Sequence, residues 1–425
     1  MMKLDKFSAP VVVFKTVPSA GHGALGILRS LGRLKVPVYA VASNPRTSSF
    51  YSRYCREKFL LDIDTTPEAK SLQFLLDVSK KIGQHPILIP TDDGAASFVG
   101  DHAEALAQAF SFQNQQPGLV HSLTSKKEMY YLAKKHGLPT PEAAFPQSRA
   151  DLLNFLPSAT YPIMLKAIDG SRLWDAAGQK MFIVRNEAEL LDKYDKLEDP
   201  ANPNLMLQEY IPGGDDTVWM FNGYFNNESD CLFAITGKKI RQYPISRGST
   251  SLGICLKNET VERSTIEFMK KIGYKGILDI GYRYDARDGA YKVLDINPRI
   301  GSSFRLFVST NGMDVARALY LDFTGQPVVP GKLHEGRKWF VEDQDLASCV
   351  AYYRSSRLTA GEWLRSFRGV EEAAYFALDD LWPCVMRTWE LFGLALGNMF
   401  HRPTEKPVRK SDQLSRQPNK LRKQT

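Results

Sequence analysis

Short apolar segments alternate with helical segments in the first quarter of this 425-residue chain. Residues 11–14 form an uninterrupted apolar run, Gly21 to Gly32 reads as a loop and a helix, and residues 37–42 and 86–90 read as further strands. Strands that alternate with helices in this way predict a parallel sheet covered by helices. The chain is therefore expected to begin with an α/β domain.

The net charge of +8 is concentrated at the C-terminus. Residues 401–425 hold eight Lys or Arg against two Asp or Glu, so +6 lies there and +2 in the rest. Nucleic-acid binding has little support, because it calls for a basic face on the fold itself. The five cysteines are scattered without metal-ligand spacing, and no run reaches the ~20 apolar residues of a membrane span, which together favour a cytoplasmic protein.

The sequence pattern changes near Ser122. Ser125 begins a capped helix, Asn186 begins another, and a third is expected from Glu259 to Ile272, ending at Gly273. We therefore expect three regions, with bounds of 1–115, 116–330 and 331–425.

Residues 21–26 match the pattern G-x-G-x-x-G between a strand and a helix. A dinucleotide site also needs an acidic residue about 20 positions later to hold the ribose. The sequence there is Ala42-Ser43-Asn44. Tight turning and close packing are therefore favoured over NAD binding, and an NAD-dependent oxidoreductase is kept as a minor alternative.

A β-hairpin is predicted from residue 276 to residue 297, with its turn at 285–289. If Asp285 faces Gly289, then Asp279 lies opposite Asp295, with Cβ atoms about 5 Å apart. Asn297 shares the face of Asp295 through the two-residue strand period. Opposed carboxylates repel, and two carboxylates with an amide suit Mg²⁺.

Basic residues near this hairpin leave a second interpretation open. Arg299 and Arg305 follow it directly and could clamp phosphate or carboxylate oxygens. In the alternative, Asp279 pairs with Arg283 or Lys292 and no metal is bound.

The segment 294–303, Leu-Asp-Ile-Asn-Pro-Arg-Ile-Gly-Ser-Ser, resembles the E-x-N-P-R signature of ATP-grasp ligases. Residues 162–166 resemble the strand of that family that carries a phosphate-binding lysine, and residues 208–215 resemble its adenine hinge. Residues 28–32 with 36–40, residues 52–55 and residues 237–244 are similar to the predicted carboxylate–amine ligases that include D-aspartate ligase.

This resemblance implies a Rossmann-like domain preceding an ATP-grasp domain with two α+β lobes, and then a small, mostly helical extension with a basic, disordered tail. It implies an ATP- and Mg²⁺-dependent ligase, with Mn²⁺ as a substitute ion, that joins a small-molecule carboxylate to an amine through an acyl phosphate. A catalytically inactive nucleotide-binding or regulatory protein is the alternative. Asp295 replaces the family's glutamate, and the phosphate loop at 169–174 has one glycine.

The resemblance also assigns roles to individual residues. Lys126 and Lys166 would contact phosphates, Gln208 the adenine amino group and Ile211 the ring, with Asp215 or Asp216 at the ribose. Glu209 belongs to the same nucleotide-binding segment. Asp279, Asp295 and Asn297 would be the metal ligands, and Arg299 would stabilise the phosphoryl group during its transfer. Arg241 and Arg247 would bind the carboxylate substrate or the acyl phosphate; the alternative for both is ordinary surface charge.

A final helix is predicted from Trp382 to Phe400, bearing Trp389, Phe392 and Leu396. Such a helix beside a +6 tail could rest on the inner face of an anionic membrane as a weak peripheral contact. The alternative, favoured for aromatic helical stripes, is packing against the enzyme core. Self-association is a further option.

Overall fold

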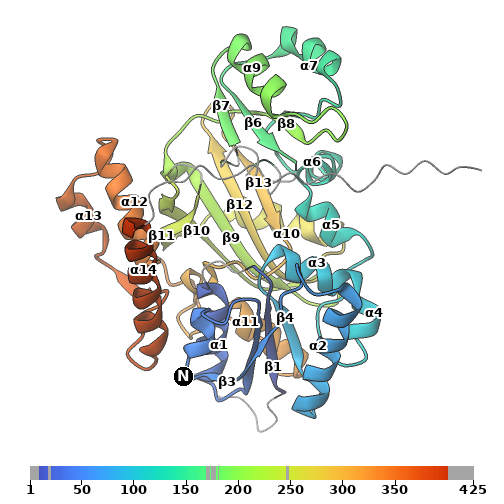
Figure 1. Cartoon of the computed structure of the whole chain (residues 1–425), viewed down its shortest axis with the longest axis vertical. Coiled ribbons are helices and arrows are strands. Elements are labelled where there is room, and N and C mark those ends of the chain that lie inside the picture. The colour runs from blue at the N-terminus through green and yellow to red at the C-terminus, as the bar shows by residue number, and fades with distance from the viewer. Residues whose placement is uncertain are drawn as a thin grey trace, which may run out of the picture.

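The computed structural model describes residues 9–17, 21–168, 173, 179, 181–245 and 248–400, with backbone alone over 394–400. Three sheets follow one another along the long axis of the molecule (Figure 1). The N-terminal sheet lies at one end, a seven-stranded sheet at the centre and a small four-stranded sheet at the other end.

The N-terminal sheet is parallel, in the order β3-β2-β1-β4, as the alternating pattern predicts. Its central strands are apolar and fully buried, which is typical of a sheet with helices on both faces. The elements are β1 (Val11–Lys15), α1 (His22–Gly32), β2 (Val38–Ala42), η1 (Ser48–Tyr51), β3 (Cys55–Leu60), α2 (Glu68–Ile82), β4 (Ile87–Pro90), α3 (Asp93–Asp101) and α4 (Ala103–Leu106).

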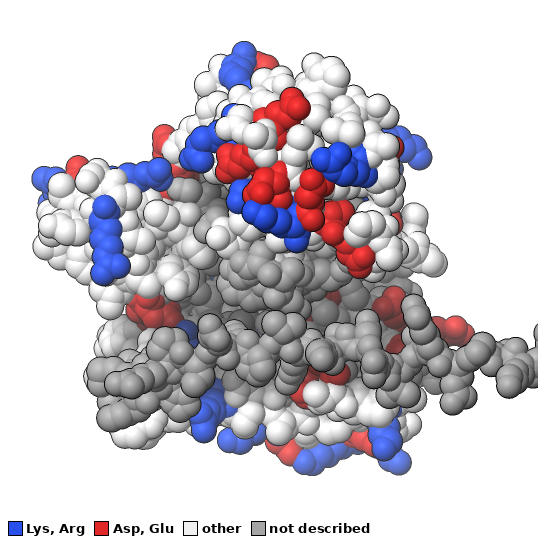
Figure 2. All heavy atoms as spheres, turned by 45° about the horizontal axis from the view of Figure 1, so that its top comes forward, with Lys and Arg blue, Asp and Glu red and all other residues white. Residues whose placement is uncertain are grey.

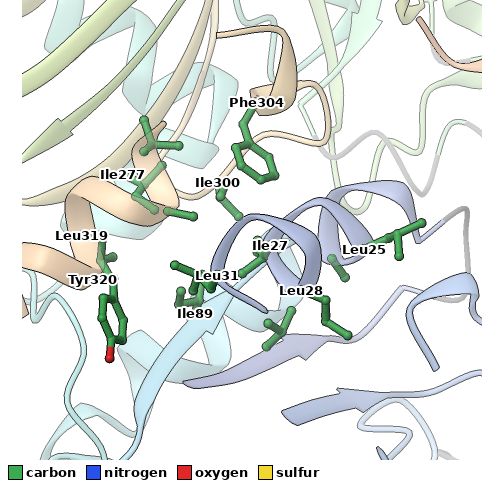
Figure 3. Packing of buried hydrophobic residues seen from close by; sticks show 14 of the residues in the cluster. Leu25, Ile27, Leu28, Leu31, Ile89, Ile277, Ile300, Phe304, Leu319 and Tyr320 are labelled. Atoms are coloured by element: carbon green, nitrogen blue, oxygen red, sulfur yellow. The ribbon is translucent and has the colours of Figure 1, made fainter. Parts of the chain in front are cut away.

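Helix α1 joins this sheet to the rest of the molecule. Leu25 to Leu31 pack with Ile89 below and with Ile277, Phe304 and Leu319 above, in one continuous core (Figure 3). A Cβ atom at Gly26 would lie 2.8 Å from a ring carbon of Phe304. The glycines of the 21–26 motif therefore allow close packing, as the favoured interpretation requires.

The small lobe has a hydrophobic core of its own. Its sheet has the order β5-β8-β6-β7 and is antiparallel throughout. It comprises β5 (Ala143–Ala144), α7 (Arg149–Phe155), η2 (Leu156–Ser158), β6 (Ile163–Ala167), β7 (Met181–Val184), α9 (Glu187–Leu197) and β8 (Leu205–Glu209), and is preceded by α5 (Leu119–Thr124) and α6 (Lys126–Lys135). Ser125 and Asn186 accept hydrogen bonds from the first turns of α6 and α9, so both predicted caps are confirmed.

The central sheet has the order β13-β12-β9-β10-β11-β14-β15. Its main part contains η3 (Asp215–Thr217), β9 (Val218–Phe225), β10 (Cys231–Tyr243), β11 (Ser249–Cys255), α10 (Glu259–Lys271), β12 (Gly276–Asp285), β13 (Ala290–Asn297), η4 (Phe304–Leu306) and α11 (Val315–Phe323). Gly273 follows α10 at φ +67°, which confirms the predicted helix end.

Residues beyond 330 continue this central sheet. They form β14 (Lys338–Phe340), α12 (Glu342–Arg354), α13 (Ala360–Ser366), β15 (Val370–Ala373) and α14 (Trp382–Phe400). Strand β14 pairs with β11, and the buried Asp380 is bonded to Arg29 of the N-terminal sheet's first helix at 2.9 Å. The C-terminal extension is thus mostly helical but built into the body of the fold. Figure 2 shows acidic and basic side chains mixed over the small-lobe end.

Candidate nucleotide and metal site

The β12–β13 hairpin forms where predicted but with a different register. Asp285 lies opposite Ala290, and a bulge between Gly281 and Tyr282 shifts the pairing again, so that Asp279 faces Asn297 and Asp295 faces Gly281. The predicted pairing of Asp279 with Asp295 is therefore wrong. The turn and the bulge each shift the pairing by one residue from the predicted register. Together they shift it by two residues, which is one strand period, so the three side chains still lie on the same face of the sheet.

The three predicted metal ligands are close together. The Asn297 amide nitrogen lies 3.4 Å from Asp279 Oδ2 and 3.1 Å from Asp295 Oδ2. A Cβ atom at Gly281 would lie 2.5 Å from Asp295 Oδ1, and one at Gly301 would overlap the Asp279 carboxylate. The two glycines leave room for the carboxylates, so the arrangement fits a hard divalent cation with oxygen ligands.

Burial raises the pKa of Asp279 to about 6, and the neighbouring Asp295 carboxylate acts in the same direction against Arg299. Asn222, which faces Asp279 from β9, is fully buried, and its Oδ1 has no hydrogen-bond partner among the described residues. No cluster of three or more His, Cys, Asp or Glu suited to a metal occurs in the described part of the chain. A cation here would therefore rely on two carboxylates and an amide.

Lys126 and Lys166 lie across a narrow gap from Leu294 of this hairpin. Lys166 is 9% exposed on β6, and burial together with the positive charge of Lys126 lowers its pKa to about 8, while Asp295 opposes the shift. Both lysines line one narrow gap with Gln208 and Leu294. Paired ammonium groups in a poorly solvated gap attract a polyanion such as a phosphate chain.

Gln208 presents an unsatisfied polar atom to the same gap. It is 7% exposed, and no hydrogen bond from the described residues reaches its Oε1. A buried amide oxygen without a donor calls for one, and an adenine amino group would supply it. Ile211 is buried two residues beyond the end of β8.

The carboxylate of Glu209 has other partners. Lys292 Nζ lies 3.2 Å from it, and Arg287 also donates to it. These contacts link β8 to the hairpin, and the predicted place of Glu209 among the nucleotide-binding side chains stays a prediction. Lys292 also pairs with Asp285 at 2.7 Å, and Arg283 donates to the Gly213 carbonyl, so the alternative pairing of Asp279 with either base is wrong.

Asp215 is held from two sides. Gln242 donates to its Oδ1 at 2.7 Å, and the hydroxyl of Tyr352 on α12 donates to its Oδ2. Asp216 is exposed beside it. The C-terminal extension thus orients one of the two candidate ribose carboxylates.

Arg299 connects the hairpin to helix α3 beside the N-terminal sheet. Its guanidinium donates to Asp93 at 2.7 Å and to Asn297 at 3.3 Å. A cleft of about 260 Å³ opens beside it, lined also by Lys15 and Ser302. Lys15 lies 4.0 Å from Asp92, and burial lowers the pKa of its ammonium group. The cleft therefore presents both signs of charge next to the hairpin.

The other predicted arginines lie elsewhere. Arg241 forms a buried, bidentate pair with Asp345 at 2.8 and 2.9 Å, and Arg305 is buried against Asp314 and Glu372, so the anion-binding roles predicted for both are corrected to structural ones. Arg247 and nearly all of the loop at 169–174 lie outside the described residues.

Sequence reasoning missed Lys239 and Asn222. Lys239 on β10 is half-buried, and its Nζ donates to the Gly248 carbonyl at 2.9 Å. Desolvation lowers its pKa against the attraction of Asp295, Asp279 and Asp215. Lys239 lies in a polar stretch of β10, Gly237 to Tyr243, so the sequence did not distinguish it from its neighbours, and its contacts depend on sheet pairing.

No protein-family model matches the chain. It is 24% identical over 293 residues to a curated protein, D-aspartate ligase of Enterococcus faecium (strain Aus0004), which covers 65% of this chain and 68% of that protein.

Solved structures match over most of the fold. N5-carboxyaminoimidazole synthetase from Staphylococcus aureus, complexed with ADP, aligns with a TM-score of 0.60 and 13% identity over 80% of this chain and 83% of that one. L-amino acid ligase from Bacillus licheniformis aligns with a TM-score of 0.56 and 15% identity over 78% and 79%. The chain therefore shares its overall fold with these two enzymes.

Two of the three sheets carry the candidate site. Lys166 and Gln208 come from the small-lobe sheet, and Asp279, Asp295 and Asn297 come from the central sheet. Lys166 and Gln208 line a narrow gap together with Leu294 of β13, which directly precedes Asp295.

Proposed function

We propose that this protein is an ATP- and Mg²⁺-dependent carboxylate–amine ligase that forms an amide or peptide bond. The observation that carries the proposal is the placement of Asp279, Asp295 and Asn297 opposite Lys166, on the two lobes of an ATP-grasp fold. The similarity to D-aspartate ligase along 65% of the chain supports the class of reaction.

The proposed chemistry has two steps. A carboxylate oxygen attacks the γ-phosphorus of ATP and the bond from that phosphorus to the ADP oxygen breaks, which yields an acyl phosphate and ADP. The amine nitrogen then attacks the acyl carbon, the bond from that carbon to the phosphate oxygen breaks, and the nitrogen loses a proton. Such transfers depend on positioning and charge neutralisation more than on covalent help from the protein.

The chain's own residues divide this work. Asp279, Asp295 and Asn297 would hold Mg²⁺ or Mn²⁺, which when bound neutralises phosphate charge. Lys126 and Lys166 would neutralise phosphate oxygens from the small-lobe side. The Oε1 of Gln208, to which none of the described residues donates, would accept from the adenine amino group.

Arg299 would stabilise the transferring group, because it reaches both the metal-ligand Asn297 and the substrate side of the site. The cleft beside it would take the small-molecule carboxylate and amine. Lys15 and Arg299 suit a carboxylate, and Asp93 suits an ammonium group, so a substrate carrying both charges fits this lining. Five free cysteines agree with a site of action in a reducing cytoplasm.

Hydroxylamine trapping tests the proposal. Purified protein with Mg·ATP and pools of carboxylates, including amino acids, is expected to release ADP and form a hydroxamate. Asp295→Asn should abolish both products, while Asp192→Asn, an exposed residue on α9, should leave them unchanged. Full hydroxamate formation by Asp295→Asn would refute the metal-site assignment.

The alternative is a catalytically inactive nucleotide-binding or regulatory protein. It is supported by Asp295, which is one methylene shorter than the glutamate of ATP-grasp ligases and lies exposed on the hairpin. It predicts that the protein binds Mg·ATP without releasing ADP with any pool. Nicotinamide binding would instead support the oxidoreductase alternative, against which the close packing of the 21–26 glycines stands.

A further inference from the structure

The last helix, α14, presents aromatic residues to solvent. Trp382 is 66% exposed, Trp389 75% and Phe392 65%, and Val385 lies between them at 50%. These four residues, here called the apolar strip, recur at intervals of three, four and three. At 100° per residue they fall within one narrow sector of the helix surface.

The opposite side of α14 is fastened to the protein. Cys384 packs against the main hydrophobic core, and Arg387 donates to Asp343 of α12 at 2.9 Å. Pro383 is buried at the start of the helix. The helix is therefore held in one orientation, with the apolar strip directed outward, and the expectation that its aromatic residues pack into the core is wrong for Trp382, Trp389 and Phe392.

Helix α12 adds apolar residues on the same edge of the molecule (Figure 1). Leu346 is 58% exposed, Val350 44% and Tyr353 65%, at helical spacing of four and three. Isolated exposed apolar side chains are ordinary, but aromatic residues that recur on one face of a helix, as on α14, mark an interaction surface.

The charge that follows α14 indicates what this surface meets. Residues 401–425 carry a net charge of +6 directly after the helix. A second copy would bring two such segments of the same sign together, which opposes association, whereas an anionic lipid surface complements them. In the described part of the chain, no helix is long and apolar enough to cross a membrane.

We propose that α14 and residues 401–425 bind the surface of an anionic bilayer, with the apolar strip inserted among the headgroups and the basic segment held by lipid charge. Each signal alone binds weakly, and the two together give stable but reversible association. The proposed ligase site is separate, so this inference does not depend on the enzyme's substrates.

Vesicle flotation with the full chain tests the proposal. We expect the protein to float with vesicles of phosphatidylcholine containing about one third phosphatidylglycerol, and not with phosphatidylcholine alone. Binding should weaken as salt rises, because the basic segment contributes electrostatically. Failure to bind the anionic vesicles at low salt would overturn the proposal.

Three variants separate the two signals. Trp389→Ser combined with Phe392→Ser, and separately deletion of residues 401–425, should each weaken vesicle binding by about tenfold. Leu153→Ser, at a 42% exposed position on α7, is the matched control and should bind as the wild type does. Mg·ATP binding should be unchanged in all three, which shows that the fold is intact.

Light scattering after size-exclusion chromatography tests the alternative, in which the apolar strip binds a second copy of the chain. A dimer that the Trp389→Ser, Phe392→Ser variant converts to a monomer would show that the apolar strip is a self-association surface. That outcome, or vesicle binding that neither the Trp389→Ser, Phe392→Ser variant nor the deletion of residues 401–425 reduces, would overturn the assignment to lipid.

Discussion

Replacement of Arg241 by alanine should destabilise the protein strongly without removing a catalytic group. The side chains of Arg241 and Asp345 are 3% and 1% exposed, and two guanidinium nitrogens meet the two carboxylate oxygens at 2.8 and 2.9 Å. Asp345 would keep the indole of Trp363 at 3.0 Å as a donor but would lose its counter-charge.

Removal of one partner from a buried ion pair costs about 3–5 kcal/mol, because the remaining charge stays desolvated. Because Trp363 still donates a hydrogen bond to Asp345, we expect Arg241→Ala to lower the free energy of unfolding by about 3 kcal/mol, the lower end of this range. The double variant Arg241→Met, Asp345→Leu should recover most of this loss, since no charge is then left buried.

Urea unfolding followed by circular dichroism measures these losses. Arg149→Ala is the matched control, because its pair with Asp195 is exposed at 55% and 45%, and its unfolding midpoint should match that of the wild type. Hydroxamate formation per folded molecule should persist in the double variant. A stable Arg241→Ala protein without turnover would refute the structural role and restore the anion-binding prediction.

Two further perturbations follow from buried groups. Burial lowers the pKa of His22 to about 4, so the neutral imidazole favours the folded state, and the free energy of unfolding should fall by up to about 3 kcal/mol as pH falls from 6.5 toward 4. The variant His22→Gln should flatten this part of the stability–pH curve, whereas His85→Gln, at an exposed position, should not. The variant Gly301→Ala should weaken Mg·ATP binding by about tenfold or more in titration calorimetry, because the added methyl group would overlap the carboxylate of Asp279, a proposed metal ligand. At Gly361 an added Cβ atom meets no atom within 4 Å, so Gly361→Ala is the control and should bind Mg·ATP normally. An unchanged acid limb in His22→Gln, or unchanged affinity in Gly301→Ala, would contradict the corresponding argument.

Local features of this protein were legible in the sequence alone. Helix starts at Ser125 and Asn186, the helix end at Gly273 and the hairpin at 276–297 depend on residues within a few positions of one another. Capping, left-handed glycine conformation and strand periodicity act over that range, so a single sequence carries them in full.

Long-range partners could be assigned only in the folded chain. Arg241 and Arg299 are both arginines near the predicted site, yet one meets Asp345 in the interior and the other meets Asp93 in an open cleft. Their fates differ because each depends on a residue about 100 to 200 positions away, brought near by sheet packing. Side-chain type determines what an arginine can bind, but tertiary packing determines which carboxylate reaches it.

The metal-ligand face shows how the two levels combine. The sequence determined that Asp279, Asp295 and Asn297 occur on paired strands, with the last two on one face by the strand period. The bulge beside Gly281 decided their register, because an extra residue in one strand shifts every later pair. Exposure of Trp389 was likewise decided by packing, since helical periodicity defines an apolar face without stating what, if anything, covers it.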